Sequence, residues 1–175
     1  MTETADRSEL RDLRVLAHPL RLRLLSLLGS GPLSAAEAAR DLGDTQANIS
    51  YHLRRLQEAG LVEVAEEVTI RGGRAKRYRH DPASGEGLGR GEPGLQDLMG
   101  AMAAELLRRA ALHAPGTPAT FTDAEFWVGD AAWERVTALV REAGIVLADA
   151  AEKPGAAGTR RISATLALFE LGASS

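Results

Sequence analysis

The stretch DTQANISYHLRRLQEAGLVEVAEEVTI, residues 44–70, decides the fold of this chain. Asp44 or Thr45 is suited to cap a helix, and Gly60 is suited to end it. The apolar side chains between them recur at helical spacing and define one buried face: Ile49, Leu53 and Leu56. After Gly60 the sequence is rich in β-branched residues, which is typical of a strand. We therefore predict a helix over 45–59 followed by a strand.

Three shorter helices are predicted upstream of this stretch. The first covers 8–17, the second covers 19–28, and a proline at the boundary separates them. The third begins after Ser34, because Ser34 and Glu37 have the spacing of a capping box, and it ends at Gly43. A turn around a glycine then joins it to the long helix, which is the arrangement of a helix-turn-helix.

A hairpin completes this first domain. The predicted strand over 61–70 is followed by a turn at 71–74 and a returning strand over 75–80. Helices followed by such a hairpin form a winged helix-turn-helix, and we call the hairpin, residues 61–80, the wing. The domain as a whole covers residues 8–80.

The face of the long helix opposite its apolar stripe carries side chains that suit contact with DNA. Gln and Asn can bond to adenine, Arg to guanine, and Ala can touch a thymine methyl group. A solvated face that binds nothing is the simpler alternative for such a helix. The sequence predicts that helix 45–59 enters the major groove with these residues: Gln46, Ala47, Asn48, Ser50, Tyr51, Arg54 and Arg55.

The wing adds positive charge to the first domain. Residues 71–80 contain five basic side chains and no acid, and phosphate contact would explain such a cluster, although an ordinary soluble hairpin is the alternative. The whole chain has a formal net charge of −3, so its overall charge does not indicate a nucleic-acid partner. The wing residues predicted to contact the DNA backbone are Arg71, Arg74, Lys76 and Arg77.

The second half of the chain begins with a Gly/Pro-rich linker at 81–94. A helix over 95–113 follows, with an apolar stripe at three- and four-residue spacing. We predict that this stripe pairs with a second copy of the chain, and packing inside its own chain is the alternative. The stripe consists of Leu95, Leu98, Met99, Met102 and Leu106.

Residues 119–171 predict a small strand-helix-strand module, with strands at 119–128 and 161–171 and a helix at 131–151. Its aromatic side chains could pack as extra core, line an organic effector pocket or extend a dimer interface, and the core interpretation is favoured. The residues concerned are Phe121, Phe126, Trp127, Trp133 and Phe169. The predicted fold class is thus mainly α with small β, comprising a winged helix-turn-helix, a dimerisation helix and this module.

Two strings in the first domain resemble ArsR-type winged-helix transcriptional regulators: LAHPLRLRLL at 16–25 and NISYHLRRLQEAGLV at 48–62. The resemblance covers roughly residues 8–80, under half of the chain. It implies a homodimeric, cytoplasmic regulator, most often a repressor, that binds a double-stranded DNA operator and responds to a signal. By position, the resemblance implies that the polar face of helix 45–59 contacts bases or nearby phosphates and that the wing contacts the DNA backbone.

Other functions find less support in the sequence. The chain has no Cys and its four His are scattered, so a metal-sensing member of the family is disfavoured and no metal or cofactor is expected. No nucleophile–base arrangement and no phosphate-binding loop is apparent, so we do not expect an enzyme. Acidic residues interrupt the N-terminus and no run of 18 apolar residues occurs, which predicts no secretion signal and no membrane partner. A winged helix that binds protein is the remaining alternative.

Overall fold

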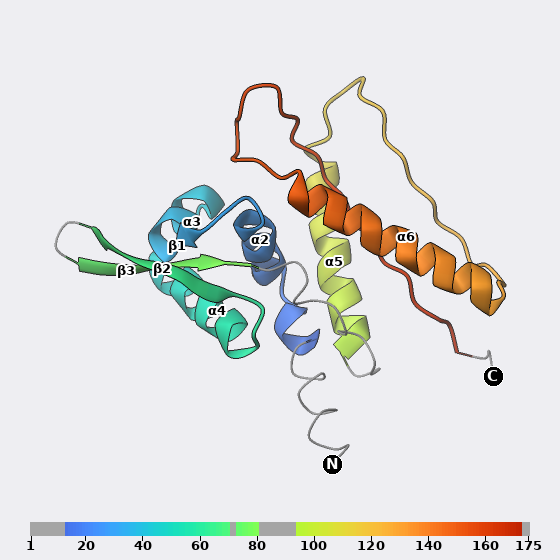
Figure 1. The fold of residues 1–175 in the computed structure, drawn as a ribbon, viewed down its shortest axis with the longest axis horizontal. Helices are drawn as coiled ribbons and strands as arrows, with labels where there is room; N and C mark the ends of the chain where they lie inside the picture. Colours follow the sequence, from blue (N-terminus) through green and yellow to red (C-terminus); the bar gives the residue numbers. More distant parts are fainter. Residues whose placement is uncertain (1–12, 71–72, 81–93, 173–175) are drawn as a thin grey trace, which may run out of the picture.

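The computed structural model describes residues 13–70, 73–80 and 94–172 (Figure 1). A helical turn at 13–16 precedes the labelled elements and belongs to the predicted helix 8–17, whose first part lies outside the described residues. The elements are, in order, α2 Pro19–Leu28, β1 Leu33–Ser34, α3 Ala35–Leu42, α4 Gln46–Glu58, β2 Glu63–Ile70, β3 Gly73–Arg79, α5 Leu95–Ala110 and α6 Asp130–Asp149.

The predicted helix boundaries in the first domain are confirmed by side-chain caps. His18 caps α2, its Nδ1 accepting a hydrogen bond from the Leu20 amide at 3.2 Å. Ser34 and Glu37 form the predicted capping box of α3: the Ser34 Oγ accepts from the Glu37 amide at 3.3 Å, and Glu37 Oε2 accepts from the Ser34 amide at 2.7 Å. Gly43 ends α3 with a φ of 68°, a conformation that favours glycine.

Helix α4 has the predicted capping residue and the predicted buried stripe. The Thr45 Oγ1 accepts from the Asn48 amide at 3.2 Å, and Gly60, with a φ of 76°, follows the helix C-terminus. The three stripe residues are fully buried: Ile49, Leu53 and Leu56. They face the apolar side chains of α2 and α3, so the core of the domain lies between the three helices and the start of the wing.

The sheet has three antiparallel strands in the order β1-β3-β2. The predicted hairpin is confirmed, with a bulge between Val64 and Glu66. Strand β2 starts at Glu63, two residues later than predicted, because the preceding apolar pair is buried in the core. The short strand β1 was not predicted; it pairs Leu33 with Tyr78 of β3 and so closes the sheet against α3. The chain is therefore mostly helical with a small antiparallel sheet, consistent with a winged helix-turn-helix.

Helix α5 packs against α2. Its buried residues, Ala101 and Glu105, lie on the face toward the domain, and Gly94 at its N-terminus is also buried. The predicted apolar stripe is only partly covered: Leu106 is 48% exposed, and the other members are half-buried, namely Leu95, Leu98, Met99 and Met102. Some of the stripe is thus used inside the chain, and the rest remains open to solvent.

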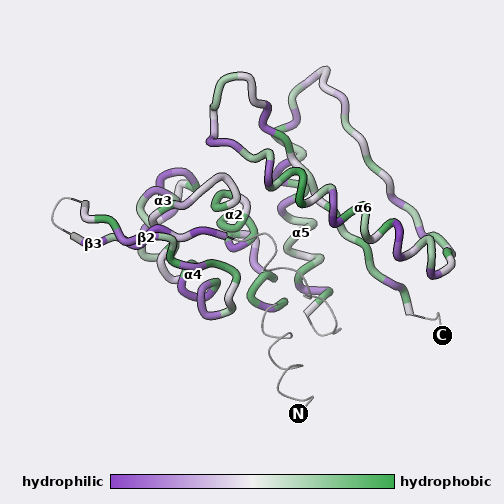
Figure 2. Tube along the Cα trace, viewed as in Figure 1, coloured by the Kyte–Doolittle hydropathy of each residue, from purple (hydrophilic) through white to green (hydrophobic). Residues whose placement is uncertain are grey.

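The C-terminal module differs from its prediction. Helix α6 is confirmed, but the strands predicted at 119–128 and 161–171 are wrong, because neither segment has a hydrogen-bonded strand partner in the described chain. A strand needs a neighbour to pair its backbone groups, and periodicity alone does not supply one. The two segments run as extended chain on either side of α6 in the view of Figure 1, and both carry apolar residues (Figure 2).

Among the residues that the structure describes, no helix is both long and apolar enough to cross a membrane.

Candidate nucleic-acid interface

The predicted DNA-contacting face of α4 points to solvent. Five of its members are exposed, among them Tyr51 with 49% of its surface accessible, and Asn48 and Ser50 are half-buried at the edges of the face. The structure thus brings these side chains together on one surface beside the N-terminus of the helix, where free backbone amides favour a phosphate. The exposed members are Gln46, Ala47, Tyr51, Arg54 and Arg55.

Asn48 is held by an acidic neighbour at the helix N-terminus. Its Nδ2 donates to Asp44 Oδ1 at 3.1 Å and to Asp44 Oδ2 at 3.0 Å. These hydrogen bonds, followed by one from the Thr45 amide, hold the pKa of Asp44 below its usual value. Adenine recognition needs the Asn amide as a donor, so Asn48 has to exchange Asp44 for a base to take the predicted role.

The arginines on the same face differ in how freely they can move. Arg54 donates from Nε to the Ser50 carbonyl, one turn earlier, at 3.3 Å, and this weak contact leaves the end of its guanidinium directed outward. Arg55 pairs with Glu58 at 2.9 Å on the exposed surface. Exposed pairs of this type are weak and are readily exchanged for a phosphate.

Two histidines and an arginine fix α4 against the rest of the domain. Arg21 Nε donates to His52 Nδ1 at 3.2 Å, and Arg21 NH1 donates to the Val15 carbonyl at 2.8 Å. Because a guanidinium only donates, His52 Nδ1 is unprotonated in this arrangement. Burial, then neighbouring His18 and Arg21, lower the pKa of His52, while Asp44 opposes the shift. His52 thus lies on the core side of α4, where it is 5% exposed.

The wing is less positive than the sequence window 71–80 indicates. Three of its arginines form ion pairs with glutamates of β2. Arg77 and Arg79 pair with the residues directly opposite them, Glu66 at 2.9 Å and Glu63, whereas Arg74 reaches diagonally to Glu67. Counted over the sequence of the whole wing, 61–80, five Lys and Arg residues stand against three Glu, which leaves a net charge of +2. The sequence-based prediction did not include these glutamates in the site. The strand register is the signal that places Glu63 and Glu66 opposite their arginines.

The four predicted wing contacts occupy different environments. Arg74 has an 81% exposed side chain, and Lys76 is also exposed, so both can reach a phosphate backbone. Arg77 is instead directed inward: it donates to the Pro32 carbonyl and lies 3.6 Å from Glu37 Oε2, with only 30% of its side chain exposed. Arg77 thus joins the wing to the start of α3. Arg71 lies outside the described residues.

The aromatic residues predicted as an extra core or as an effector pocket form neither within the chain. Phe121 is 88%, Phe126 70% and Trp127 102% exposed, and side chains this open bury too little surface to serve as core or as the walls of an enclosed pocket. Trp133 is half-buried and Phe169 is 47% exposed.

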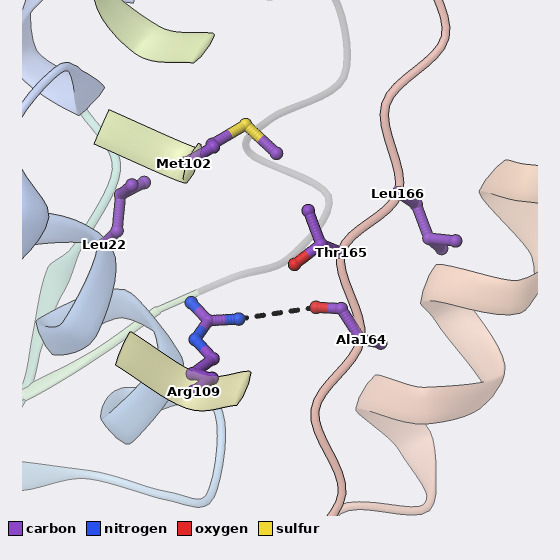
Figure 3. A pocket seen from close by; sticks show the side chains of 6 residues that line it. All are labelled: Leu22, Met102, Arg109, Ala164, Thr165 and Leu166. Carbon is purple, nitrogen blue, oxygen red and sulfur yellow. Dashed lines mark hydrogen bonds between the residues drawn. The ribbon is translucent and has the colours of Figure 1, made fainter. Parts of the chain in front are cut away.

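A cavity of about 180 Å³ lies elsewhere, between α2, α5 and the last extended segment (Figure 3). There Arg109 NH1 donates to the Ala164 carbonyl at 3.4 Å. None of the five predicted pocket residues is among those that line it, which are Leu22, Met102, Arg109, Ala164, Thr165 and Leu166.

Comparison with known proteins supports the helix-turn-helix. Residues 16–65 match the family described as a helix-turn-helix domain. The chain is 36% identical over 62 residues to an uncharacterised helix-turn-helix-type transcriptional regulator of Methanocaldococcus jannaschii, an alignment that covers 35% of this chain and 63% of that protein. Both matches support a helix-turn-helix domain in this chain.

Two further similarities are more limited. The chain is 41% identical over 71 residues to the bifunctional glutamine synthetase adenylyltransferase/adenylyl-removing enzyme of Streptomyces coelicolor, covering 37% of this chain and 7% of that enzyme. The crystal structure of M. tuberculosis Rv0081 aligns with 58% of this chain and 86% of its own, at 27% identity and a TM-score of 0.37. The chain spans less than two thirds of the length of the curated relatives it matches.

Proposed function

We propose that this chain is a homodimeric, ArsR-type transcriptional regulator that binds a double-stranded DNA operator. The observation that carries the proposal is the exposed polar face of α4, placed beside a capped helix N-terminus within a helix-turn-helix. Gln46 and Arg54 are the side chains on this face best suited to contact base edges, since Gln pairs with adenine and Arg with guanine. The resemblance to ArsR-type regulators favours a repressor over an activator.

The wing would hold the backbone beside the groove. Arg74 and Lys76 are exposed cations of β3, and phosphate would compete with Glu67 for Arg74. Such contacts carry no sequence information but set the register of the protein on the duplex. Arg77 takes a structural role in this proposal, because its guanidinium already bonds to Pro32 and Glu66.

A dimer fits this mode of binding. Two α4 helices related by a two-fold axis and separated by about 34 Å enter successive major grooves, which would make the operator pseudo-palindromic. The part of α5 left uncovered by α2 and the exposed C-terminal module are the surfaces available for such pairing.

The test is binding to the intergenic DNA upstream of its own gene, over several salt concentrations and with random DNA as competitor. Wild-type protein should give a complex that survives competitor and weakens steeply with salt. Arg54→Ala should lose roughly 1–3 kcal/mol of DNA-binding free energy and relax selectivity at one base pair. Arg74→Ala should instead weaken binding to all DNA sequences alike and reduce the salt dependence of binding. Arg141→Ala, on the exposed surface of α6, is the matched control.

A winged helix that binds protein is the second candidate, favoured by the glutamates that neutralise three wing arginines. It predicts no salt-dependent DNA affinity for the wild-type chain. If both Arg54→Ala and Arg74→Ala bind DNA like the wild type, the DNA face is misassigned.

A further inference from the structure

The C-terminal module leaves nearly all of its apolar surface uncovered. Every residue from 111 to 132 and from 157 to 172 is exposed, and α6 buries none of its 20 residues. The exposed side chains include large apolar groups that a folded chain normally covers. The largest exposures are those of Phe121, Phe126, Trp127, Ile162 and Leu171.

The two extended segments have the composition of strands but lack strand partners. In the second segment apolar residues alternate along the chain, as they do on a strand with one buried face: Ile162, Ala164, Leu166 and Leu168. Within the described residues, neither this segment nor 119–128 belongs to a sheet. Both therefore expose a row of backbone donors and acceptors of the kind that an added strand would pair.

We propose that these segments pair with the same segments of a second copy, forming an intermolecular sheet covered by the two α6 helices. One chain supplies two strands, which are too few for a stable sheet, whereas two copies supply four. A two-fold axis makes this pairing self-complementary, since each copy offers the surface that the other needs. The inference rests on the homodimer proposed above and names its interface, but it does not depend on the DNA contacts.

The exposed area is large enough for such an interface. Phe121, Phe126 and Trp127 alone expose roughly 500 Å² per protomer, given about 200 Å² for an aromatic side chain. Two copies would therefore bury about 1,000 Å² from these residues, which reaches the lower limit for a specific interface before any aliphatic residue is counted. Leu106 and Leu107 of α5, 48% and 74% exposed, would extend it.

Proline substitution separates pairing between chains from folding within one chain. Successive backbone amides of a strand point to opposite edges, so either Ala164 or Thr165 donates to a given neighbour. Ala164→Pro and Thr165→Pro each remove one donor in a segment that lies in no helix or sheet of the single chain. The carbonyl of residue 164, which accepts from Arg109, is retained in both. Ala164→Val and Thr165→Val are the matched controls, since they keep the amide.

The measurements are the molar mass in solution and hydrogen exchange of the full-length chain. Wild-type protein should have twice the 18.6 kDa chain mass, with amides of 119–128 and 161–171 protected at concentrations where the dimer forms. At least one Pro variant should weaken dimerisation by roughly tenfold to a hundredfold, while both Val variants stay dimeric. Helical circular dichroism should be unchanged in all four, which would show that the domains remain folded.

Three results would overturn the proposal. A wild-type chain that remains at 18.6 kDa would exclude the intermolecular sheet. A dimer whose two segments exchange like unfolded chain would place the interface elsewhere, such as on α5, and would leave the proposed regulator intact. A dimer that tolerates both Pro substitutions would also exclude the pairing. Operator binding by the same samples tests the proposed function separately, because the substitutions lie outside α4 and the wing.

Discussion

The rings of His18 and His52 are in contact, with their centroids 4.6 Å apart and their planes tilted by 44°. His18 caps α2 through its Nδ1, and His52, on α4, accepts from Arg21 through its own Nδ1. Both contacts require an unprotonated nitrogen, and both rings lie within reach of the same guanidinium. These two hydrogen bonds are therefore present only while both imidazoles are neutral at Nδ1.

We predict that the free energy of unfolding falls as the pH is lowered from 7.5 to 5.5. Burial is the main cause that lowers the pKa of His18, followed by Arg21 and Arg23, and burial likewise leads for His52. Below the ordinary value of 6.5, the unfolded chain therefore binds protons that the folded chain excludes, and stability is lost. Urea unfolding at the two pH values measures the effect.

The double variant His18→Gln, His52→Gln is the control, and its stability should change less between these pH values. Glu37 and Asp44 also contribute to stability, because hydrogen bonds from Ser34 and Asn48 lower their pKa values. Their stabilising contributions are lost only at more acidic pH than 5.5. Equal stability of the wild type at pH 7.5 and 5.5 would show that protonation of His18 and His52 does not control unfolding.

Replacement by Ala should destabilise the chain far more at Arg77 than at Arg74. Arg77 donates hydrogen bonds to Pro32 and Glu66 and forms an ion pair with Glu37, so Arg77→Ala should cost about 1–2 kcal/mol of unfolding free energy. Arg74 is exposed beside Glu67, and Arg74→Ala should cost less than about 0.5 kcal/mol while weakening DNA binding. Denaturant titration ranks the two stabilities. The same cost for both would refute the structural role of Arg77.

Glu105 ties α5 to α2 through a buried carboxylate. It is 2% exposed, and Arg23 of α2 lies 3.1 Å from its Oε1, while Arg108 and Arg109 approach Oε2 at 2.9 and 3.7 Å. Glu105→Gln would leave three cations without a counter-charge. We expect the free energy of unfolding to fall by about 2–3 kcal/mol. This is at or below the lower end of the cost of breaking a fully buried ion pair, because the arginines here are partly solvated.

Glu58→Gln is the matched control for this prediction, because it breaks an exposed pair with Arg55 and should change stability by less than about 0.5 kcal/mol. Thermal unfolding in the same buffer compares the two variants. If Glu105→Gln is as stable as the wild type, α5 is held to α2 by apolar contacts and not by this cluster.

The features that sequence analysis predicted correctly are local ones. Ser34, Glu37 and Gly43 define α3 because a cap, its reciprocal partner and a left-handed glycine lie within ten residues of one another. The exposed face of α4 follows in the same way from Ile49, Leu53 and Leu56, since a helix places residues of this spacing on one side. These patterns need no knowledge of distant contacts.

The features that it missed depend on contacts between distant residues. Arg77 was predicted as a DNA contact because its neighbours in sequence are basic, but its partners lie on β2, on α3 and before β1. The strands at 119–128 and 161–171 were predicted from periodicity, which indicates what a segment can pair with but not whether the chain supplies the partner. The apolar surface they expose is the reason to look for that partner in a second copy.

Two glycines at the start of α5 and within it should respond with opposite signs to the same substitution. A Cβ on Gly94 would lie 2.6 Å from the Leu13 Cβ, an atom fixed to the backbone that has no flexible end to move aside. Gly94→Ala should therefore push α5 away from the helical turn at 13–16 and lower the free energy of unfolding by about 1–3 kcal/mol. Gly100 has open space around its Cα within the helix, so Gly100→Ala should stabilise the chain by about 0.5–1 kcal/mol through lower backbone entropy.

Denaturant unfolding of the two variants in parallel checks this pair of predictions. A Gly94→Ala variant as stable as Gly100→Ala would mean that Leu13 does not pack against the start of α5. In that case α5 would be positioned mainly by Glu105 and its arginines.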